Sequence, residues 1–300
     1  MKRKGEWGRG VKGKTPELLD QYFTKPDVAR RCVSFLKGLV DFGVLDFILE
    51  PCFGEGAFVE ALEEEVSKDV LHFIDIDAKD KTHRMDFLKD FKPPAESKAI
   101  LTVGNPPFGR QSRKAVAFFQ RASGFSKVIA FIVPRTFRKY SIQSKLSPHF
   151  FFAGEEEVPP KSFIYLGKDF GVLSVFQVWV HGEFVDRMKV PFPIPENKIR
   201  VIPAPVRKTD DFCFVKRSQD PDFTIQKLGV SAGRIITEDV SSRSENSYLF
   251  IKVFDRDKVK EVLERFLSLG LETTPIKYQT VACPSISQNE LCILYNGGKF

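Results

Sequence analysis

Cysteines and long apolar runs are both scarce in this sequence of 300 residues. Its five cysteines are an odd and scattered set without a C-x-x-C pair, so neither a disulfide framework nor a zinc site is expected, and no other metal site is predicted. No apolar run is long enough to cross a bilayer, and the chain starts polar and basic, without the apolar core of a signal peptide. We therefore expect an intracellular protein of a reducing compartment, the cytoplasm or the nucleus, that has no membrane partner.

Acidic side chains are also missing from one long stretch, although the chain has 39 of them in total. No aspartate or glutamate occurs between Ser97 and Gly154, a segment called the basic window below. Its positive charges are Lys98, Arg110, Arg113, Lys114, Arg121, Lys127, Arg135, Arg138, Lys139 and Lys145. Charges of this kind often only solvate helices, but so long a stretch without an acid favours a surface that attracts a polyanion. Binding through phosphates would then depend on salt.

Composition divides the chain into four parts. Residues 1–14 mix glycine with lysine and arginine, and we expect a disordered basic tail. Residues 15–190 alternate strand-sized and helix-sized apolar segments, which predicts crossover units and a mostly parallel sheet. Residues 191–210 form a proline-rich linker, because proline excludes a regular helix or a central strand. Residues 211–300 are expected to form a small α+β unit.

The apolar spacing also predicts individual elements. Two strands at 164–166 and 172–180 have no helix between them, which predicts an antiparallel hairpin at one sheet edge. The remaining expected strands are 44–49, 70–74, 99–103, 128–133, 212–216 and 248–253, and the expected helices start at residue 26 or cover 56–66, 113–122 and 255–269.

The most informative motif follows the expected strand 99–103. Asn105 offers a side-chain carbonyl acceptor, and Pro106 and Pro107 lack a backbone N–H and fix φ, so the loop presents acceptors without competing donors. Phe108 supplies a flat face on which a base could stack. Asparagine, proline and glycine are also common turn residues, so the four-residue motif alone leaves an ordinary turn open.

A second motif lies between the expected strand 44–49 and the helix that follows it. Glu50 and Pro51 precede Gly54 and Gly56, and two glycines here allow the backbone to approach a ligand at the carboxyl ends of the strands. The third glycine of a dinucleotide fingerprint is absent, which weakens a pyrophosphate-binding interpretation. Asp75 ends the next strand, where an acid would bond ribose hydroxyls; a helix N-cap is the alternative.

Taken together, these segments resemble the S-adenosylmethionine-dependent amino-methyltransferases, and within them the adenine-N6 group. The likeness extends over roughly residues 20–180. It implies a Rossmann-like, seven-stranded, mostly parallel sheet of a class I methyltransferase within residues 15–190, with the C-terminal α+β unit serving substrate recognition. It also implies S-adenosylmethionine as the cofactor and nucleic acid, DNA or RNA, as the partner.

The resemblance assigns roles to single residues. Lys25 intervenes where the family often has a proline, and the ribose-binding acid is ambiguous between Asp75 and Asp77. Thr24 is implied to lie near the methionine carboxylate. The cofactor-binding residues implied are Tyr22, Thr24, Glu50, Pro51, Gly54, Gly56, Asp75, Asp86 and Phe87, and the catalytic residues implied are Asn105, Pro106, Pro107 and Phe108.

The implied reaction follows from the chemistry of an exocyclic amine, whose lone pair is delocalised into the ring. Acceptors from Asn105 and the Pro106 carbonyl would bind both amino hydrogens and point the lone pair at the sulfonium methyl, a positioning and electrostatic effect. Phe108 would stack on the base, and a base in a duplex would first have to leave the helix. The residues expected to grip the nucleic acid are Arg110, Arg113, Lys114, Arg135, Arg138 and Lys139.

Two other classes of function remain open from the sequence. The same cofactor could serve a different acceptor, either guanine N2 in RNA or a protein glutamine, because both related groups use an Asn-Pro-Pro-aromatic loop. The glutamate–proline start of the cofactor loop argues for adenine. A catalytically inactive nucleic-acid-binding subunit is the third interpretation, and the presence of both motifs together argues against it.

Overall fold

The structure is a computed structural model that describes residues 22–191, 209–280 and 283–297. The expected basic tail lies outside the described residues, as does most of the expected linker. In the ranges just given, no helix is both long and apolar enough to cross a membrane.

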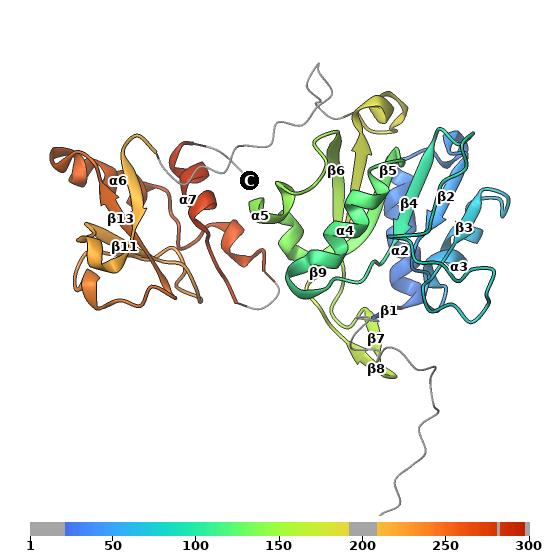
Figure 1. The fold of residues 1–300 in the computed structure, drawn as a ribbon, viewed down its shortest axis with the longest axis horizontal. Helices are drawn as coiled ribbons and strands as arrows, with labels where there is room; N and C mark the ends of the chain where they lie inside the picture. The colour runs from blue at the N-terminus through green and yellow to red at the C-terminus, as the bar shows by residue number, and fades with distance from the viewer. Residues whose placement is uncertain (1–21, 192–208, 281–282, 298–300) are drawn as a thin grey trace, which may run out of the picture.

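A six-stranded sheet forms the centre of the N-terminal part, in the order β3-β2-β4-β5-β9-β6 (Figure 1). The strands β3, β2, β4 and β5 are parallel, and β9 is antiparallel to both of its neighbours, β5 and β6. This arrangement is Rossmann-like. The strand bounds are β2 Phe47–Glu50, β3 Leu71–Phe73, β4 Ile100–Gly104, β5 Val128–Pro134, β6 Phe150–Glu157 and β9 Ser174–His181.

Both faces of this sheet are covered, which explains why β5 is buried along its whole length. On one face, Leu101 and Ala130 belong to an apolar cluster with α2 (Pro26–Leu39) and α3 (Ala57–Glu63). On the other, Ile129 and Phe131 pack with α4 (Arg113–Ala122). Successive strand residues point to opposite faces, so one apolar run serves both clusters.

The seventh strand implied by the resemblance is reduced to a single bridge. Asp75, just beyond β3, pairs in parallel with Arg84, and the Met85 N–H donates to the Asp75 carbonyl at 3.1 Å. The chain then leaves the sheet, because the Asp86 carboxylate accepts from the Leu88 N–H at 3.0 Å and starts a turn. The sheet therefore has six strands within the described residues, and the prediction of seven is corrected.

The expected edge hairpin is also corrected. Residues 163–165 form β7 (Phe163–Tyr165), which pairs with β8 (Lys168–Phe170) and with β1 (Phe23–Thr24), in a separate three-stranded sheet. The strand β9 instead lies inside the main sheet, because β6 covers its outer edge. The sequence pattern predicted no strand at β6, so the neighbour of β9 on its outer side was missed.

The C-terminal unit has a sheet of its own, in the order β10-β13-β11-β12. Its apolar cluster draws only on residues 212–295, including Phe212, Phe223 and Phe266. Figure 1 shows this unit beside α5, at the side of the molecule away from β3. The bounds are β10 Phe212–Val215, β11 Phe223–Gln226, β12 Ile235–Ile236, β13 Tyr248–Val253, α5 Tyr140–Gln143, α6 Val259–Ser268 and α7 Gln288–Tyr295.

Candidate active site

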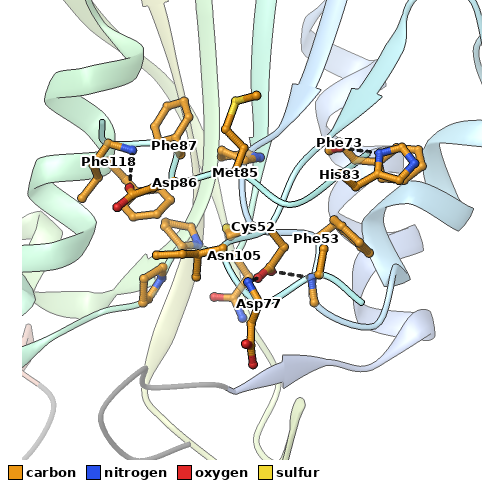
Figure 2. Close-up of a pocket in the computed structure, with 18 of the residues that line it drawn as sticks. Cys52, Phe53, Phe73, Asp77, His83, Met85, Asp86, Phe87, Asn105 and Phe118 are labelled. Carbon is orange, nitrogen blue, oxygen red and sulfur yellow. Dashed lines mark hydrogen bonds between the residues drawn. The ribbon is translucent and has the colours of Figure 1, made fainter. Parts of the chain in front are cut away.

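A cavity of about 1170 Å³ opens where the carboxyl ends of β2, β3 and β4 meet. Cys52 and Asn105 lie centrally in it, with Asp77 below them (Figure 2). On one side are the Asp86, Phe87 and Phe118 side chains, and on the opposite side are Phe53, Phe73 and His83. This position, outside the carboxyl ends of parallel strands, is where open α/β sheets bind ligands.

Asn105 directly follows β4 and is held by its amide nitrogen. Nδ2 donates to the Tyr22 carbonyl at 2.8 Å and to the Thr24 hydroxyl at 3.1 Å. These two bonds fix which end of the amide is the donor, so Oδ1 is left as an acceptor. Oδ1 is buried and accepts no hydrogen bond from the described part of the chain. A buried acceptor of this kind costs free energy until a donor reaches it.

The three residues after Asn105 all line the cavity. Phe108 is only 8% exposed, and its ring centroid lies 6.4 Å from that of Tyr22 and 6.4 Å from that of Phe163. Tyr22 in turn stacks on Phe170 of β8 at 5.0 Å. The Asn105–Phe108 loop is therefore backed by aromatic rings from β7 and β8, segments that carried no signal for a site in the sequence.

The glycine turn after β2 is tied to Asp75. The Gly54 N–H donates to Asp75 Oδ2 at 3.0 Å, and the Asp77 N–H donates to Oδ1 at 2.8 Å. Asp75 thus holds the turn, while both it and Asp77 line the cavity. Gly54 has φ +56°, and a Cβ there would lie 3.0 Å from Phe23, so the position requires glycine. Gly56, in contrast, caps α3 and lines neither of the two cavities at this edge.

Glu50 ends β2 and lies beneath this turn. It is 2% exposed, and its Oε2 has no hydrogen-bond partner among the described residues. Glu50, Thr24 and Asn105 line a second hollow of about 30 Å³, adjoining the large cavity and able to hold about one water molecule. Gly104 permits this closeness, because a Cβ on Gly104 would lie 3.1 Å from Glu50 Cγ.

Burial governs the protonation of the acidic groups here. It raises the pKa of Glu50 well above the ordinary value of 4.5, and the neighbouring charge of Asp75 raises it further. Burial also raises the pKa of Asp75, although the Asp77 and Gly54 N–H groups favour its charged form. The Cys52 thiol has a raised pKa for the same reason, which keeps it a thiol and makes it a poor nucleophile.

Pro51, Asp86 and Phe87, which the resemblance implies as cofactor-binding residues, also line the cavity. Asp86 binds the Leu88 N–H and forms an ion pair with Lys89 at 3.2 Å. Phe87 is 2% exposed and packs on Phe118 at a centroid distance of 5.1 Å. Phe53, Phe73 and His83 form an aromatic wall that sequence reasoning missed, since their spacing in the chain gives no common pattern.

The residues proposed to grip nucleic acid fall into two groups. Arg110 and Arg113 are exposed just after the Asn105–Phe108 loop, and Lys114 lines the cavity. Arg135 forms an ion pair with Glu157 at 2.9 Å. Arg138 forms ion pairs with Glu157 at 2.7 Å and with Glu155. The charges of this second group are thus neutralised by carboxylates of β6, whereas Arg110 and Arg113 present their charge next to the Asn105–Phe108 loop.

Lys139 requires a correction. Its side chain is 7% exposed, and its ammonium donates to Glu290 at 2.9 Å, to the Ser285 carbonyl at 2.7 Å and to the Ile276 carbonyl at 3.1 Å. Three partners from the C-terminal unit enclose it, so it has no free donor for a phosphate. The sequence could not reveal this, because every partner is more than 130 residues away.

No family model matches the chain, and no curated protein matches it either. Among solved structures, a proposed RNA methyltransferase from Pyrococcus horikoshii is 17% identical, with 58% of this chain and 90% of that one covered at a TM-score of 0.37. A Thermoplasma acidophilum protein is 16% identical, with 53% and 87% covered and a TM-score of 0.38.

A third structure is phosphoethanolamine N-methyltransferase 2 of Haemonchus contortus, with phosphomonomethylethanolamine and S-adenosylhomocysteine bound. It is 15% identical, with 57% of this chain and 39% of that one covered, at a TM-score of 0.35. Likenesses at this level are too weak to transfer an activity. The chemistry of the site is therefore inferred from the residues of this chain.

Proposed function

We propose that the protein is an S-adenosylmethionine-dependent methyltransferase that methylates the exocyclic N6 of adenine in nucleic acid. The observation that carries the proposal is the state of Asn105. Its Nδ2 is held by Tyr22 and Thr24, while its Oδ1 is a buried acceptor without a donor among the described residues, beside the Gly54 turn. This is the arrangement that a planar amino group entering the cavity would complete.

The residues present fit the cofactor. The cavity of about 1170 Å³ exceeds the usual range for a single ligand, so it has room for a cofactor and part of a substrate. Glu50 offers a buried oxygen, unpartnered within the described ranges, that is suited to an ammonium group. Asp75 or Asp77 would meet ribose hydroxyls, and Asp86 with Phe87 would flank the adenine of the cofactor. When bound, the cofactor supplies an electrophilic methyl group on a sulfonium.

The residues of this chain would act by position and electrostatics. Asn105 Oδ1 and the Pro106 carbonyl accept hydrogen bonds from the target amino group, which draws its lone pair out of conjugation with the ring. Pro106 and Pro107 stiffen the loop and add no N–H that would compete for these acceptors. Phe108 holds the base plane, and its burial against Tyr22 and Phe163 keeps its ring in place.

A polynucleotide acceptor is supported by the exposed charges that follow the Asn105–Phe108 loop. Arg110 and Arg113 are exposed and close in sequence to Phe108, so a phosphate backbone could be held beside a base in the cavity. A base in a duplex would have to be flipped out to reach Asn105. Guanine N2 and a protein glutamine present a similar planar amine, and they are outcomes that the acceptor test separates.

The acceptor test uses the full chain with methyl-labelled S-adenosylmethionine and separate pools of DNA, RNA and protein. Mass spectrometry of the nucleosides from the labelled pool is expected to find N6-methyladenine. Label at guanine N2, or only in protein glutamine, would show that this group and not adenine N6 is the acceptor. Failure to bind the cofactor in a calorimetric titration would instead indicate an inactive nucleic-acid-binding subunit.

Asn105→Ala tests the catalytic assignment. Removing the acceptor while leaving the glycine turn intact should lower kcat at least about 100-fold, a loss typical of a removed transition-state hydrogen bond. The affinity for S-adenosylmethionine should stay near the wild-type value. Asn246→Ala, at an exposed position in the C-terminal unit, is the matched control and should keep full activity. Full activity of Asn105→Ala would refute the assignment.

A further inference from the structure

The backbone just after the Asn105–Phe108 loop has an unusual conformation. Gly109 has φ +69°, and Gln111 and Ser112 have φ +56° and +61°. Left-handed conformations at two successive residues with side chains are unfavourable, and they persist only where surrounding contacts hold them. The segment 109–112 therefore depends on its neighbours for its shape.

A contact from outside this segment comes from η3 (Arg135–Arg138), the short turn that follows β5. The Ser112 hydroxyl shares a hydrogen bond of 2.8 Å with the Thr136 hydroxyl. Ser112 is 4% exposed, so this bond is shielded from water. Phe137 is fully buried in the core and anchors η3 to the sheet. The turn is thus a fixed support for the end of the catalytic loop.

The same turn is bound on its other side by the C-terminal unit. Lys139, whose N–H donates to the Thr136 carbonyl at 2.9 Å, is enclosed by Glu290 and by the Ile276 and Ser285 carbonyls. Arg138 Nη1 adds a bond of 2.7 Å to Gln279 Oε1. A stretch of five residues, 135–139, therefore contacts both the catalytic loop and the C-terminal unit.

We propose that Thr136 and Lys139 are positioning residues that couple docking of the C-terminal unit to the geometry of the catalytic loop. The C-terminal unit then does more than contact substrate: its seating on Lys139 sets the turn that supports Ser112. This inference rests on the proposed function, because it concerns the same Asn105–Phe108 loop. The alternative is that the Lys139–Glu290 pair only attaches the two units to each other.

Backbone hydrogen exchange in the full chain distinguishes coupling to the loop from simple attachment of the two units, and it needs no substrate. The amides to follow are Ser112, which donates to the Gly109 carbonyl at 3.1 Å, and Ala115, which donates to the Phe108 carbonyl at 3.3 Å. Lys139→Met should speed exchange at both amides as well as in the C-terminal unit. Lys127→Met, which removes an ion pair with Glu183 outside the turn, is the control and should leave both amides unchanged.

Faster exchange in the C-terminal unit alone, with Ser112 and Ala115 unchanged in Lys139→Met, would overturn the inference. If Lys139→Met does not fold, Glu290→Gln weakens the same contact without removing the lysine, and the same two amides decide. This readout works even if the wild-type protein methylates no acceptor. Failure of the proposed function and failure of this inference are therefore distinguishable.

Kinetics supply the second readout. Thr136→Val removes one hydroxyl at nearly constant volume, and kcat should fall about tenfold through misplacement of the loop, with KM for cofactor unchanged. Thr136→Ser keeps the hydroxyl and should restore kcat. Thr102→Val is the matched control, because Thr102, in the middle of β4, makes a similar buried bond of 2.7 Å to the hydroxyl of Ser126. Equal kcat in wild type and Thr136→Val would contradict the role of Thr136.

Discussion

Glu50 carries a carboxyl group that burial keeps protonated far above the ordinary pKa of 4.5. The unfolded chain loses this proton near 4.5, whereas the folded protein holds it until the raised pKa is reached. Between these two values the folded state binds more protons, so its stability falls as the pH rises. The contribution of Glu50 to the free energy of unfolding is fully present below pH 4.5, and it is lost as the pH rises through the raised pKa of the folded state.

Glu50→Gln removes this titration, because an amide of the same shape has no proton to lose. Without cofactor, the free energy of unfolding of the wild type should fall relative to Glu50→Gln as the pH rises above 4.5. Urea denaturation of both proteins across a pH series measures the difference. Glu60→Gln, on the exposed face of α3, should follow the wild type. Parallel curves for wild type and Glu50→Gln would contradict the effect of burial.

At single residues, the sequence predicted the region of the fold in which a residue lies better than it predicted the contacts of its side chain. The pattern around Asn105 and Glu50 placed both at one edge of the sheet, and the structure brings them to one small hollow. Thr24 is expected beside a cofactor carboxylate, and the bond that its hydroxyl accepts from Asn105 was not predicted. Lys139 was interpreted as a surface cation and is buried. Local spacing cannot reveal such pairings, because they join segments that only the tertiary fold brings together.

Among the secondary-structure elements, those with strong apolar periodicity were predicted well. The helix α4 has the expected bounds, and β13 also matches residue for residue. The strand β6 was missed because its second half is Gly154 followed by three glutamates, which looks like a polar turn. In the sheet, two of those glutamates pair with the basic side chains of η3. Edge strands tolerate such charge. Because the edge strand β6 was not predicted, β9 was expected at the sheet edge instead of inside the sheet.

The glycine turn is the element whose conformation can be tested most directly. Gly54→Ala places a Cβ 3.0 Å from Phe23 at φ +56°, so it should destabilise the fold by about 1–2 kcal/mol and weaken cofactor binding. Gly38→Ala is the control, because a Cβ there meets nothing within 4 Å inside α2. It should instead stabilise by about 0.5–1 kcal/mol. Thermal unfolding and a cofactor titration measure both; unchanged cofactor affinity in Gly54→Ala would remove the turn from the binding site.

For the whole molecule, the basic window was interpreted as one surface, and the fold divides it. Acidic residues from outside the window reach Lys127, Arg135, Arg138 and Lys139, so much of its charge is neutralised locally. Lys98 lies at the amino end of β4, opposite the cavity. The net charge of a sequence segment therefore overstates the electrostatic field at a site when acidic residues from other segments pair with its basic side chains.

The exposed charges that follow the Asn105–Phe108 loop lead to a prediction about salt. If Arg110 and Arg113 contact phosphates, Arg110→Ala with Arg113→Ala should weaken nucleic-acid binding at low salt and flatten its salt dependence. The slope of log K against log salt should decrease by about 0.9 for each duplex phosphate that is no longer neutralised. Lys98→Ala is the control, since it is exposed and basic but at the other end of β4. Fluorescence anisotropy with a labelled duplex over a salt series measures the slopes, and equal slopes for all three proteins would place the nucleic acid elsewhere on the molecule.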